Sequence, residues 1–229
     1  MADFLLIHGA CLGGWTWTDV VDRLRAAGHG AVAPDLPCDD LGAGLGEYAD
    51  VAAAALGDAA GEVVVVGHSL GALVAPLVAT RVRTRRLVML AGIVGAPGRS
   101  LADLAVEDAD RDLPLGDDEI DLDDAGRFRF SASGARRALF HDFTPSQADA
   151  GIDRLRFQRS MWTQVADFAD WPDAEIVSVT CTEDRIVNPA WSDRVARERL
   201  GVQPVHLAGG HMPSIARAAE LCAVLTAGL

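Results

Sequence analysis

A serine stands in the turn Gly67-His68-Ser69-Leu70-Gly71, directly after four consecutive valines and directly before a helical pattern. A strand, a Gly-X-Ser-X-Gly turn and a helix form a nucleophile elbow, in which a sharp, strained turn holds the serine hydroxyl clear of the sheet. Glycines suit both ends of such a turn, because a side chain there would clash across it. The pattern therefore predicts Ser69 as a nucleophile. The alternative is an ordinary glycine-containing loop.

A serine hydroxyl needs a base to take its proton, and the base expected is a histidine oriented by a carboxylate. Of the six histidines, His211 is the best placed, because it follows the last expected strand and precedes the last expected helix. Pro213 suits the first turn of that helix. We interpret His206 as packed against a helix, His29 as solvent-facing, and His68 as a residue that shapes the elbow.

The carboxylate should come from the end of another strand. Glu183 and Asp184 both follow the expected strand 176–181. Neighbouring side chains point in opposite directions, so only one of the two should face the histidine. Position alone leaves the choice between them open.

An oxyanion formed at the attacked carbonyl group needs two backbone N–H donors. Leu70 supplies one, because it follows Ser69 at the start of a helix. The loop 8–14 contains three glycines and can turn its amides inward, and Ala10 is its best candidate. A glycine-rich turn without a ligand is the alternative for this loop.

Short apolar runs alternate with longer helical patterns along most of the chain. This alternation predicts an α/β fold with a parallel sheet and helices on both faces. In such a sheet the functional site lies at the carboxyl ends of the strands. The expected strands are 4–8, 31–33, 63–66, 87–91, 176–181 and 204–207, and the expected helices are 16–27, 46–60, 70–82, 189–200 and 214–227.

The alternation breaks between residues 94 and 171, which we interpret as a helical cap inserted over the strand ends. Residues 1–93 and 172–229 then form the core of the same single domain. The acidic stretch 103–124 favours a solvated or mobile loop, whereas residues 128–171 are rich in aromatic side chains. The side chains expected to line a substrate pocket are Trp15, His68, His141, Phe143, Phe157, Met161, Trp162 and Met212.

Net charge and apolar composition exclude some partners and indicate where the protein is located. The net charge of −13 argues against nucleic acid and anionic membranes as partners. The first residues do not read as a signal peptide and no apolar run is long enough to span a membrane, so we expect a cytoplasmic protein.

Four scattered cysteines indicate neither a metal site nor a disulfide framework. All basic residues are arginines, which excludes Schiff-base chemistry on lysine. The same composition suggests a bacterial source.

Four stretches of the chain resemble the α/β-hydrolase superfamily. Within it, they look like the branch of plant methylesterases, salicylate-binding esterases, hydroxynitrile lyases and their bacterial relatives. The stretches are HGACLGGWTW at 8–17, VVVVGHSLGA at 63–72, CTEDRIVNPAW at 181–191 and GGHMPSIARAAEL at 209–221. The resemblance implies Ser69 as nucleophile, Asp184 as acid, His211 as base, and Ala10 and Leu70 as oxyanion donors.

The chain also departs from that branch. Leu12 stands where the family often has histidine, and the usual two extra N-terminal strands are missing, so we expect about six parallel strands. The lyases need threonine where this chain has Gly9 and lysine where it has Met212, which disfavours cyanohydrin cleavage. Dehalogenases and epoxide hydrolases of this fold use aspartate at the Ser69 position, so they are disfavoured too.

The sequence therefore predicts a serine hydrolase that needs no cofactor and cleaves a small, largely apolar carboxylic ester. An acyltransferase, a lactonase or a C–C hydrolase with the same triad is the enzymatic alternative. A small-ligand-binding protein on a hydrolase scaffold is the non-catalytic alternative. The sequence does not identify the substrate. It is compatible with a homodimer but does not decide the oligomeric state.

Overall fold

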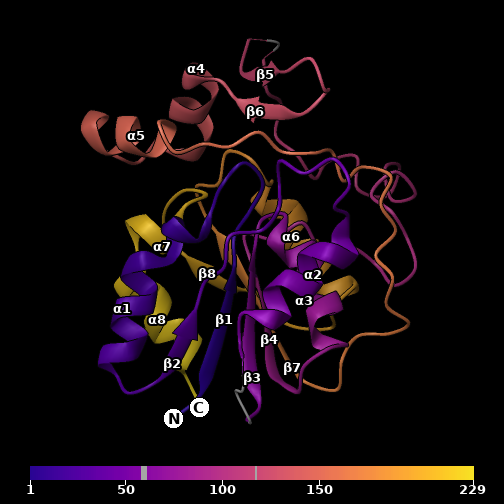
Figure 1. Ribbon diagram of the computed structural model, residues 1–229, viewed down its shortest axis with the longest axis vertical. Coiled ribbons are helices and arrows are strands. Elements are labelled where there is room, and N and C mark those ends of the chain that lie inside the picture. Colours follow the sequence, from indigo (N-terminus) through magenta and orange to yellow (C-terminus); the bar gives the residue numbers. More distant parts are fainter. Residues whose placement is uncertain (58–60, 117) are drawn as a thin grey trace.

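Six parallel strands form the central sheet of the computed structural model, which describes residues 1–57, 61–116 and 118–229. They follow the order β2-β1-β3-β4-β7-β8 across the sheet (Figure 1). The predicted six-stranded parallel sheet is therefore confirmed, and each strand overlaps its expected range. The strands are β1 (Asp3–Ile7), β2 (Gly30–Val32), β3 (Val63–His68), β4 (Thr84–Leu90), β7 (Glu175–Cys181) and β8 (Val205–Leu207).

Helices cover both faces of this sheet, because successive side chains of a strand point to opposite faces. In β1, Leu5 and Ile7 pack into one layer, whereas Phe4 and Leu6 pack into the other. The first layer holds α2 (Leu45–Ala54), α3 (Gly71–Ala79) and α6 (Pro189–Glu198). The second holds α1 (Thr18–Ala26) and α8 (Ala218–Thr226) on the opposite face (Figure 1).

The largest differences from the expected helices are in α1, α2 and the C-terminal helix, whereas α3 and α6 end only two or three residues early. The segment Gly14–Trp17 forms a 3₁₀ turn before α1. The expected helix 214–227 is divided at Arg217 into α7 (Pro213–Ala216) and α8. The expected helix 46–60 ends at Ala54, and residues 58–60 lie outside the described part of the chain.

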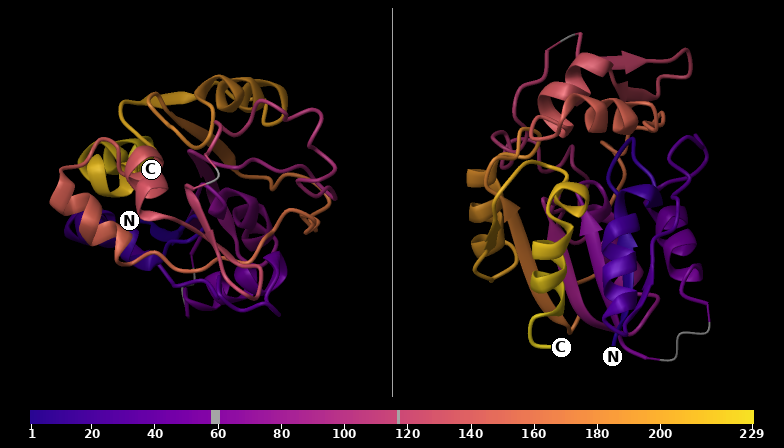
Figure 2. Two further views of the ribbon diagram at one scale, coloured as in Figure 1. Left: turned by 90° about the horizontal axis from the view of Figure 1, so that it is seen from above. Right: turned by 90° about the vertical axis from the view of Figure 1, so that its left-hand side faces the viewer.

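Residues 94–171 are called the excursion below, and their helices and short strands lie over the carboxyl ends of the central strands (Figures 1 and 2). They are less helical than expected. Phe128 and Phe130 flank Arg129 with the two-residue period of a strand, and this segment pairs with a second short strand. The division into core and cap stays a prediction. The regular elements of the excursion are β5 (Ile120–Leu122), β6 (Phe128–Phe130), α4 (Ala132–Gly134), a π-helical turn (Ala135–Leu139) and α5 (Pro145–Ile152).

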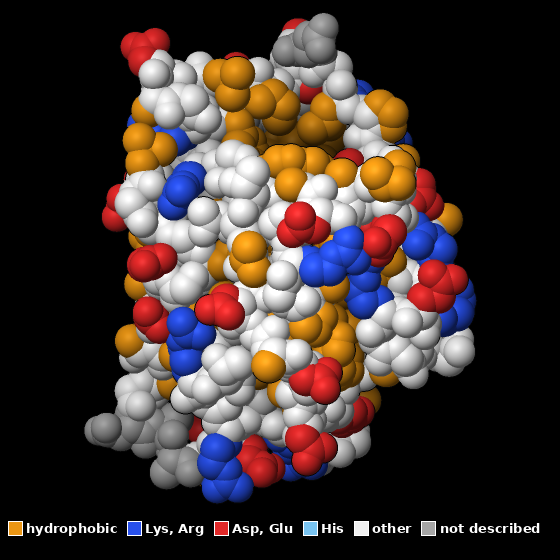
Figure 3. All heavy atoms as spheres, turned by 90° about the vertical axis from the view of Figure 1, so that its right-hand side faces the viewer, with side chains coloured by type: hydrophobic (Ala, Val, Ile, Leu, Met, Phe, Trp, Pro, Cys, Tyr) orange, Lys and Arg blue, Asp and Glu red, His pale blue; other side chains and the backbone are white. Residues whose placement is uncertain are grey.

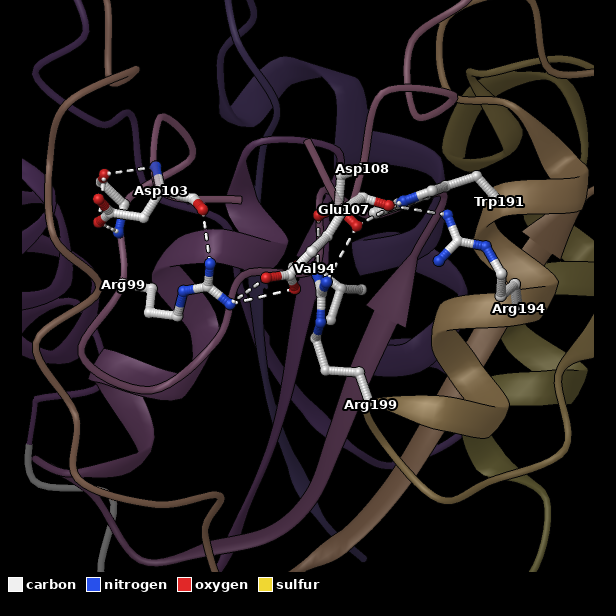
Figure 4. A network of polar contacts seen from close by, with 9 residues as sticks. Val94, Arg99, Asp103, Glu107, Asp108, Trp191, Arg194 and Arg199 are labelled. Atoms are coloured by element: carbon white, nitrogen blue, oxygen red, sulfur yellow. Dashed lines mark hydrogen bonds and ion pairs between the residues drawn. The ribbon is translucent and has the colours of Figure 1, made fainter. Parts of the chain in front are cut away.

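The acidic stretch is not simply solvated, because Asp108 and Glu119 are buried within it. Arg199 Nη2 donates to Asp108 Oδ1 at 2.9 Å, and Trp191 Nε1 donates to the same oxygen at 3.0 Å (Figure 4). A buried carboxylate is tolerated only when it is paired in this way. The expectation of a solvated loop is therefore wrong at Asp108. The expected mobility of the stretch stays a prediction, and residue 117 lies outside the described residues.

Within the described ranges, no helix is long and apolar enough to cross a membrane. The four cysteines are free thiols, and Cys11, Cys38 and Cys181 are buried. Burial raises the pKa of the Cys38 thiol to about 11. These cysteines act as small apolar side chains in the core.

Candidate active site

Ser69 occupies the turn between β3 and α3 with a φ of +52°, a left-handed conformation that few residues other than glycine adopt. Its N–H donates to Leu90 O at 3.0 Å, which fixes the turn to the neighbouring strand β4. A Cβ atom on Gly67 would lie 2.4 Å from Gly71 O, and one on Gly71 would lie 2.6 Å from Ile7 O. Both glycines are therefore required by close backbone approach, as the sequence pattern predicts.

The loop after β1 lies directly beside this serine. Strand order reverses at β1, which pairs with β2 on one side and β3 on the other, and such a switch point is where ligands bind in parallel sheets. A Cβ atom on Gly9 would lie 2.8 Å from Ser69 Cβ. Among the described residues, neither the Ala10 nor the Leu70 N–H donates to another protein atom. The role of these two N–H groups as oxyanion donors stays a prediction.

The structure brings Asp184, not Glu183, to His211. Asp184 Oδ2 lies 2.7 Å from His211 Nδ1, and each side chain is only 2% exposed. The second oxygen, Asp184 Oδ1, accepts from the N–H groups of Ile186 at 2.8 Å and Val187 at 3.1 Å. These bonds fix the carboxylate, which in turn holds the proton on Nδ1 and leaves Nε2 of the imidazole as an acceptor.

His68 joins the elbow to the loop of His211. Its Nε2 donates to His211 O at 2.7 Å, and the two ring centroids are 4.8 Å apart. Burial lowers the pKa of His68 well below its usual value, so this imidazole is neutral. No hydrogen bond between Ser69 Oγ and His211 occurs within the described part of the chain. In a free enzyme such contacts are often longer than in its substrate complex.

His8, to which the sequence analysis gave no role, holds the loop after β1. Its Nδ1 donates to Gly9 O at 2.8 Å, and its Nε2 accepts from Leu36 N–H at 2.9 Å. Burial lowers the pKa of His8 to about 4, which keeps the ring neutral and able to make both bonds. The signal that could have found it is its position at the carboxyl end of the first strand.

A pocket of about 190 Å³ adjoins the two backbone donors. The expected pocket residues Met161 and Trp162 line it, the first buried and the second 44% exposed. Figure 3 shows hydrophobic side chains gathered around a hollow near the top of the molecule. Proximity to Met161 in the sequence could have pointed to Arg159 and Ser160. The pocket residues that the sequence analysis missed are Ile93, Leu101, Phe128, Arg159 and Ser160.

Two other expected pocket residues line a separate groove of about 370 Å³ that involves α1, α5 and α7. These are Trp15, whose ring is covered by the Arg154 guanidinium at 4.3 Å, and Phe143. Trp17, by contrast, is fully buried in the core. Neither Trp15 nor Phe143 lines the pocket beside Leu70, so their role in a substrate pocket stays a prediction.

Three further expected pocket residues have other contacts, and their role in a substrate pocket stays a prediction. Phe157 packs under the Arg129 guanidinium, 4.7 Å from the ring centroid. Met212 is fully buried in the apolar cluster between the excursion and the core. His141 Nε2 donates to Glu183 O at 3.0 Å, so its ring contacts the loop of Asp184.

Histidines outside the site have other partners. His206 is exposed and lies 2.9 Å from Asp193 Oδ2 of α6, so its interpretation as a packed side chain is only partly correct. His29 is half-buried and accepts from Ala2 N–H at 3.2 Å, which makes it less solvent-facing than expected. No group of three or more metal-ligating side chains occurs among residues 1–57, 61–116 and 118–229.

The chain has a parallel sheet, a strained serine at a strand end and a buried Asp-His pair. This combination is characteristic of α/β-hydrolases. The chain belongs to the alpha/beta hydrolase family, because the model of that family matches residues 4–224.

Curated relatives match shorter stretches. The carbendazim hydrolyzing esterase of Nocardioides sp. (strain SG-4G) is 34% identical over 117 residues, which cover 44% of this chain and 46% of that protein. Esterase PIR7B of Oryza sativa subsp. japonica is 43% identical over 84 residues, which cover 31% of this chain and 30% of that protein. The chain thus spans less than half the length of these relatives.

Solved structures match nearly the whole chain. The methylesterase MES16 from Arabidopsis superposes with a TM-score of 0.78 at 18% identity, over 98% of this chain and 97% of that one. A pyrethroid hydrolase from Sphingobium faniae JZ-2 superposes with a TM-score of 0.72 at 21% identity, over 98% and 95%. At these identities the likeness establishes the fold.

Proposed function

We propose that this chain is a serine hydrolase that cleaves a small, largely apolar carboxylic ester through an acyl-enzyme. The observation that carries the proposal is the buried Asp184–His211 pair, 2.7 Å apart, at the same sheet edge as the strained Ser69. A nucleophile, a base and an orienting acid are the parts that acyl transfer requires. The esterases among the curated relatives support the same reaction class.

Each residue then has a distinct role. Ser69 Oγ attacks the ester carbonyl carbon while His211 Nε2 takes its proton, and Asp184 stabilises the imidazolium. The oxyanion accepts hydrogen bonds from the Ala10 and Leu70 N–H groups, each worth roughly 10²- to 10³-fold in kcat. His211 then returns the proton to the leaving alcohol. Water, deprotonated by the same histidine, finally releases the acid and restores Ser69.

The preference for an apolar ester rests on the pocket beside Ala10 and Leu70. Its walls are mostly hydrophobic, and its volume of about 190 Å³ suits a small acyl or alkoxy group. The ester itself, a cytoplasmic location, a bacterial source and a homodimer stay predictions.

Hydrolysis of 4-nitrophenyl acetate by the parent and by Ser69→Ala tests the proposal. We expect a burst of nitrophenol equal to the enzyme concentration in the parent, and a loss of roughly 10³-fold or more in kcat in the variant. Ser146→Ala, at an exposed serine of α5, is the matched control and should keep parental activity. Hydrolysis at the parental rate by Ser69→Ala would refute the nucleophile. Added alcohol that accelerates turnover would favour acyl transfer over hydrolysis.

A further inference from the structure

Two adjacent residues of the excursion, His141 and Asp142, contact both loops that carry the proposed acid and base. His141 Nε2 donates to Glu183 O at 3.0 Å, one residue before Asp184. Asp142 Oδ2 accepts from Gly210 N–H at 3.0 Å, one residue before His211. Both bonds are made to the backbone, so they fix the path of each loop rather than one side chain.

The two loops are also joined directly to each other. Glu183 N–H donates to Gly209 O at 3.0 Å. Together with the bonds from His141 and Asp142, this closes a ring of contacts around the Asp184–His211 pair. A change in any one member therefore alters how the acid and the base face each other.

The fit around Gly210 is too tight for this contact to be incidental. A Cβ atom on Gly210 would lie 2.5 Å from His141 Nε2 and 3.1 Å from Asp142 Oδ1. Gly209 has a φ of +115°, a conformation that glycine adopts most easily. The two glycines before His211 thus allow the excursion to approach the backbone of this loop closely.

The segment that carries both residues is anchored by apolar packing on either side. Phe140, next to His141, is buried and meets Phe143 edge to face with ring centroids 5.4 Å apart. Phe140 shares an apolar cluster with Met212, the residue after His211. Backbone bonds and apolar contacts therefore tie the same short piece of the excursion to the loop of the base.

We propose that His141 and Asp142 are positioning residues, which fix the loops of Asp184 and His211 relative to each other. Through these contacts, the position of the excursion on the core affects the geometry of the Asp184–His211 pair. Neither residue touches the reacting atoms. The catalytic consequence rests on the proposed function. The effect on the Asp184–His211 hydrogen bond does not, and it can be measured without a substrate.

The kinetic test uses Asp142→Ala and Asp142→Asn with 4-nitrophenyl acetate. The alanine variant loses the acceptor for Gly210 N–H, so kcat should fall roughly 10- to 100-fold while KM stays within about 3-fold. The asparagine variant keeps an acceptor oxygen and should recover kcat to within about 3-fold of the parent. Asp149→Ala, at an exposed aspartate of α5 that pairs with Arg136, is the matched control and should behave as the parent.

The second readout is the low-field proton resonance of His211 Nδ1–H, assigned by its loss in His211→Gln. We expect Asp142→Ala to shift or broaden this resonance, and Asp142→Asn and Asp149→Ala to leave it unchanged. If Asp142→Ala does not fold, His141→Leu replaces it in both measurements. Leucine removes the donor to Glu183 O, whereas the control His141→Gln keeps a donor. A resonance and a kcat that both stay parental in Asp142→Ala and in His141→Leu would overturn the proposal.

The two proposals fail in different ways. If Ser69→Ala keeps parental activity, the proposed function fails, while the resonance in the Asp142 variants still decides the positioning role. If Ser69→Ala is inactive but Asp142→Ala and His141→Leu are both parental in rate and resonance, only the positioning role fails.

Discussion

Asp184 Oδ2 lies 2.7 Å from His211 Nδ1, and solvent reaches only 2% of either side chain. Each oxygen of this carboxylate has a partner, because Oδ1 accepts from two backbone N–H groups. A carboxylate bound in this way cannot rotate without losing several bonds at once. The direction and the tautomer of the histidine are therefore set before any substrate arrives.

Replacing Asp184 by asparagine should lower kcat on the order of 10³- to 10⁴-fold, because the amide favours the wrong tautomer of His211. Glu183→Gln changes the exposed neighbour in the same chemical way and should stay within about 3-fold of the parent. Both values come from steady-state hydrolysis of a nitrophenyl ester. A large loss in Glu183→Gln together with a parental Asp184→Asn would show that the acid is misassigned.

Trp162 should influence which acyl groups the enzyme prefers. It lines the pocket beside Ala10 and Leu70, so Trp162→Ala should lower the ratio of kcat/KM for a butyrate over an acetate ester roughly 5- to 10-fold. Trp15→Ala is the matched control, because Trp15 lines the other groove. A ratio that changes in Trp15→Ala but not in Trp162→Ala would place the acyl group elsewhere.

Gly71→Ala should destabilise the fold by about 2 kcal/mol or more, because its Cβ atom would meet backbone oxygens of Ile7 at 2.6 Å and His8 at 2.8 Å. Gly46→Ala is the control. Gly46 lies within α2 with open space around it, so alanine there should stabilise by about 0.5–1 kcal/mol. Urea unfolding measures both free energies. Equal stability of Gly71→Ala and the parent would contradict the close packing of the elbow against β1.

His8 should make the protein less stable in acid. Its pKa is about 4 in the folded protein against 6.5 ordinarily, so the unfolded chain binds the proton first as the pH falls. The stability from neutral His8 is complete above pH 6.5 and is lost as the pH falls towards 4. Between pH 7.5 and pH 5 this amounts to about 2 kcal/mol.

The comparison with His8→Gln isolates that contribution, since His68 acts in the same direction in both proteins. Urea unfolding at the two pH values should show a smaller loss of unfolding free energy in the variant than in the parent. Equal losses would mean that His8 is not buried in its neutral form.

The elbow could be predicted because its signals are local. The valine run, Gly67, Ser69 and Gly71 lie within ten residues, and backbone geometry alone demands their order. The burial of Asp108 could not be predicted, because it depends on an ion pair with Arg199, which is 91 residues away in the chain. Nothing in an acidic run distinguishes its buried carboxylates, Asp108 and Glu119, from the solvated ones.

The excursion was harder to predict for a related reason. Phe143 and Met161 look equivalent as apolar residues of one segment, yet one lines the groove near α5 and the other lines the pocket beside Leu70. Which one lines the pocket beside Leu70 depends on how the segment packs on the core, and this packing depends on long-range contacts such as that of His141 with Glu183. The composition of the segment carries no information about these contacts.

Labelling with a fluorophosphonate, followed by digestion and mass spectrometry, tests most directly whether Ser69 is a nucleophile activated by His211. We expect one adduct per chain on the peptide that contains Ser69, no adduct in Ser69→Ala, and labelling slowed on the order of 10³-fold in His211→Ala. An adduct on another residue, or equal labelling of the parent and Ser69→Ala, would contradict the assignment of this site.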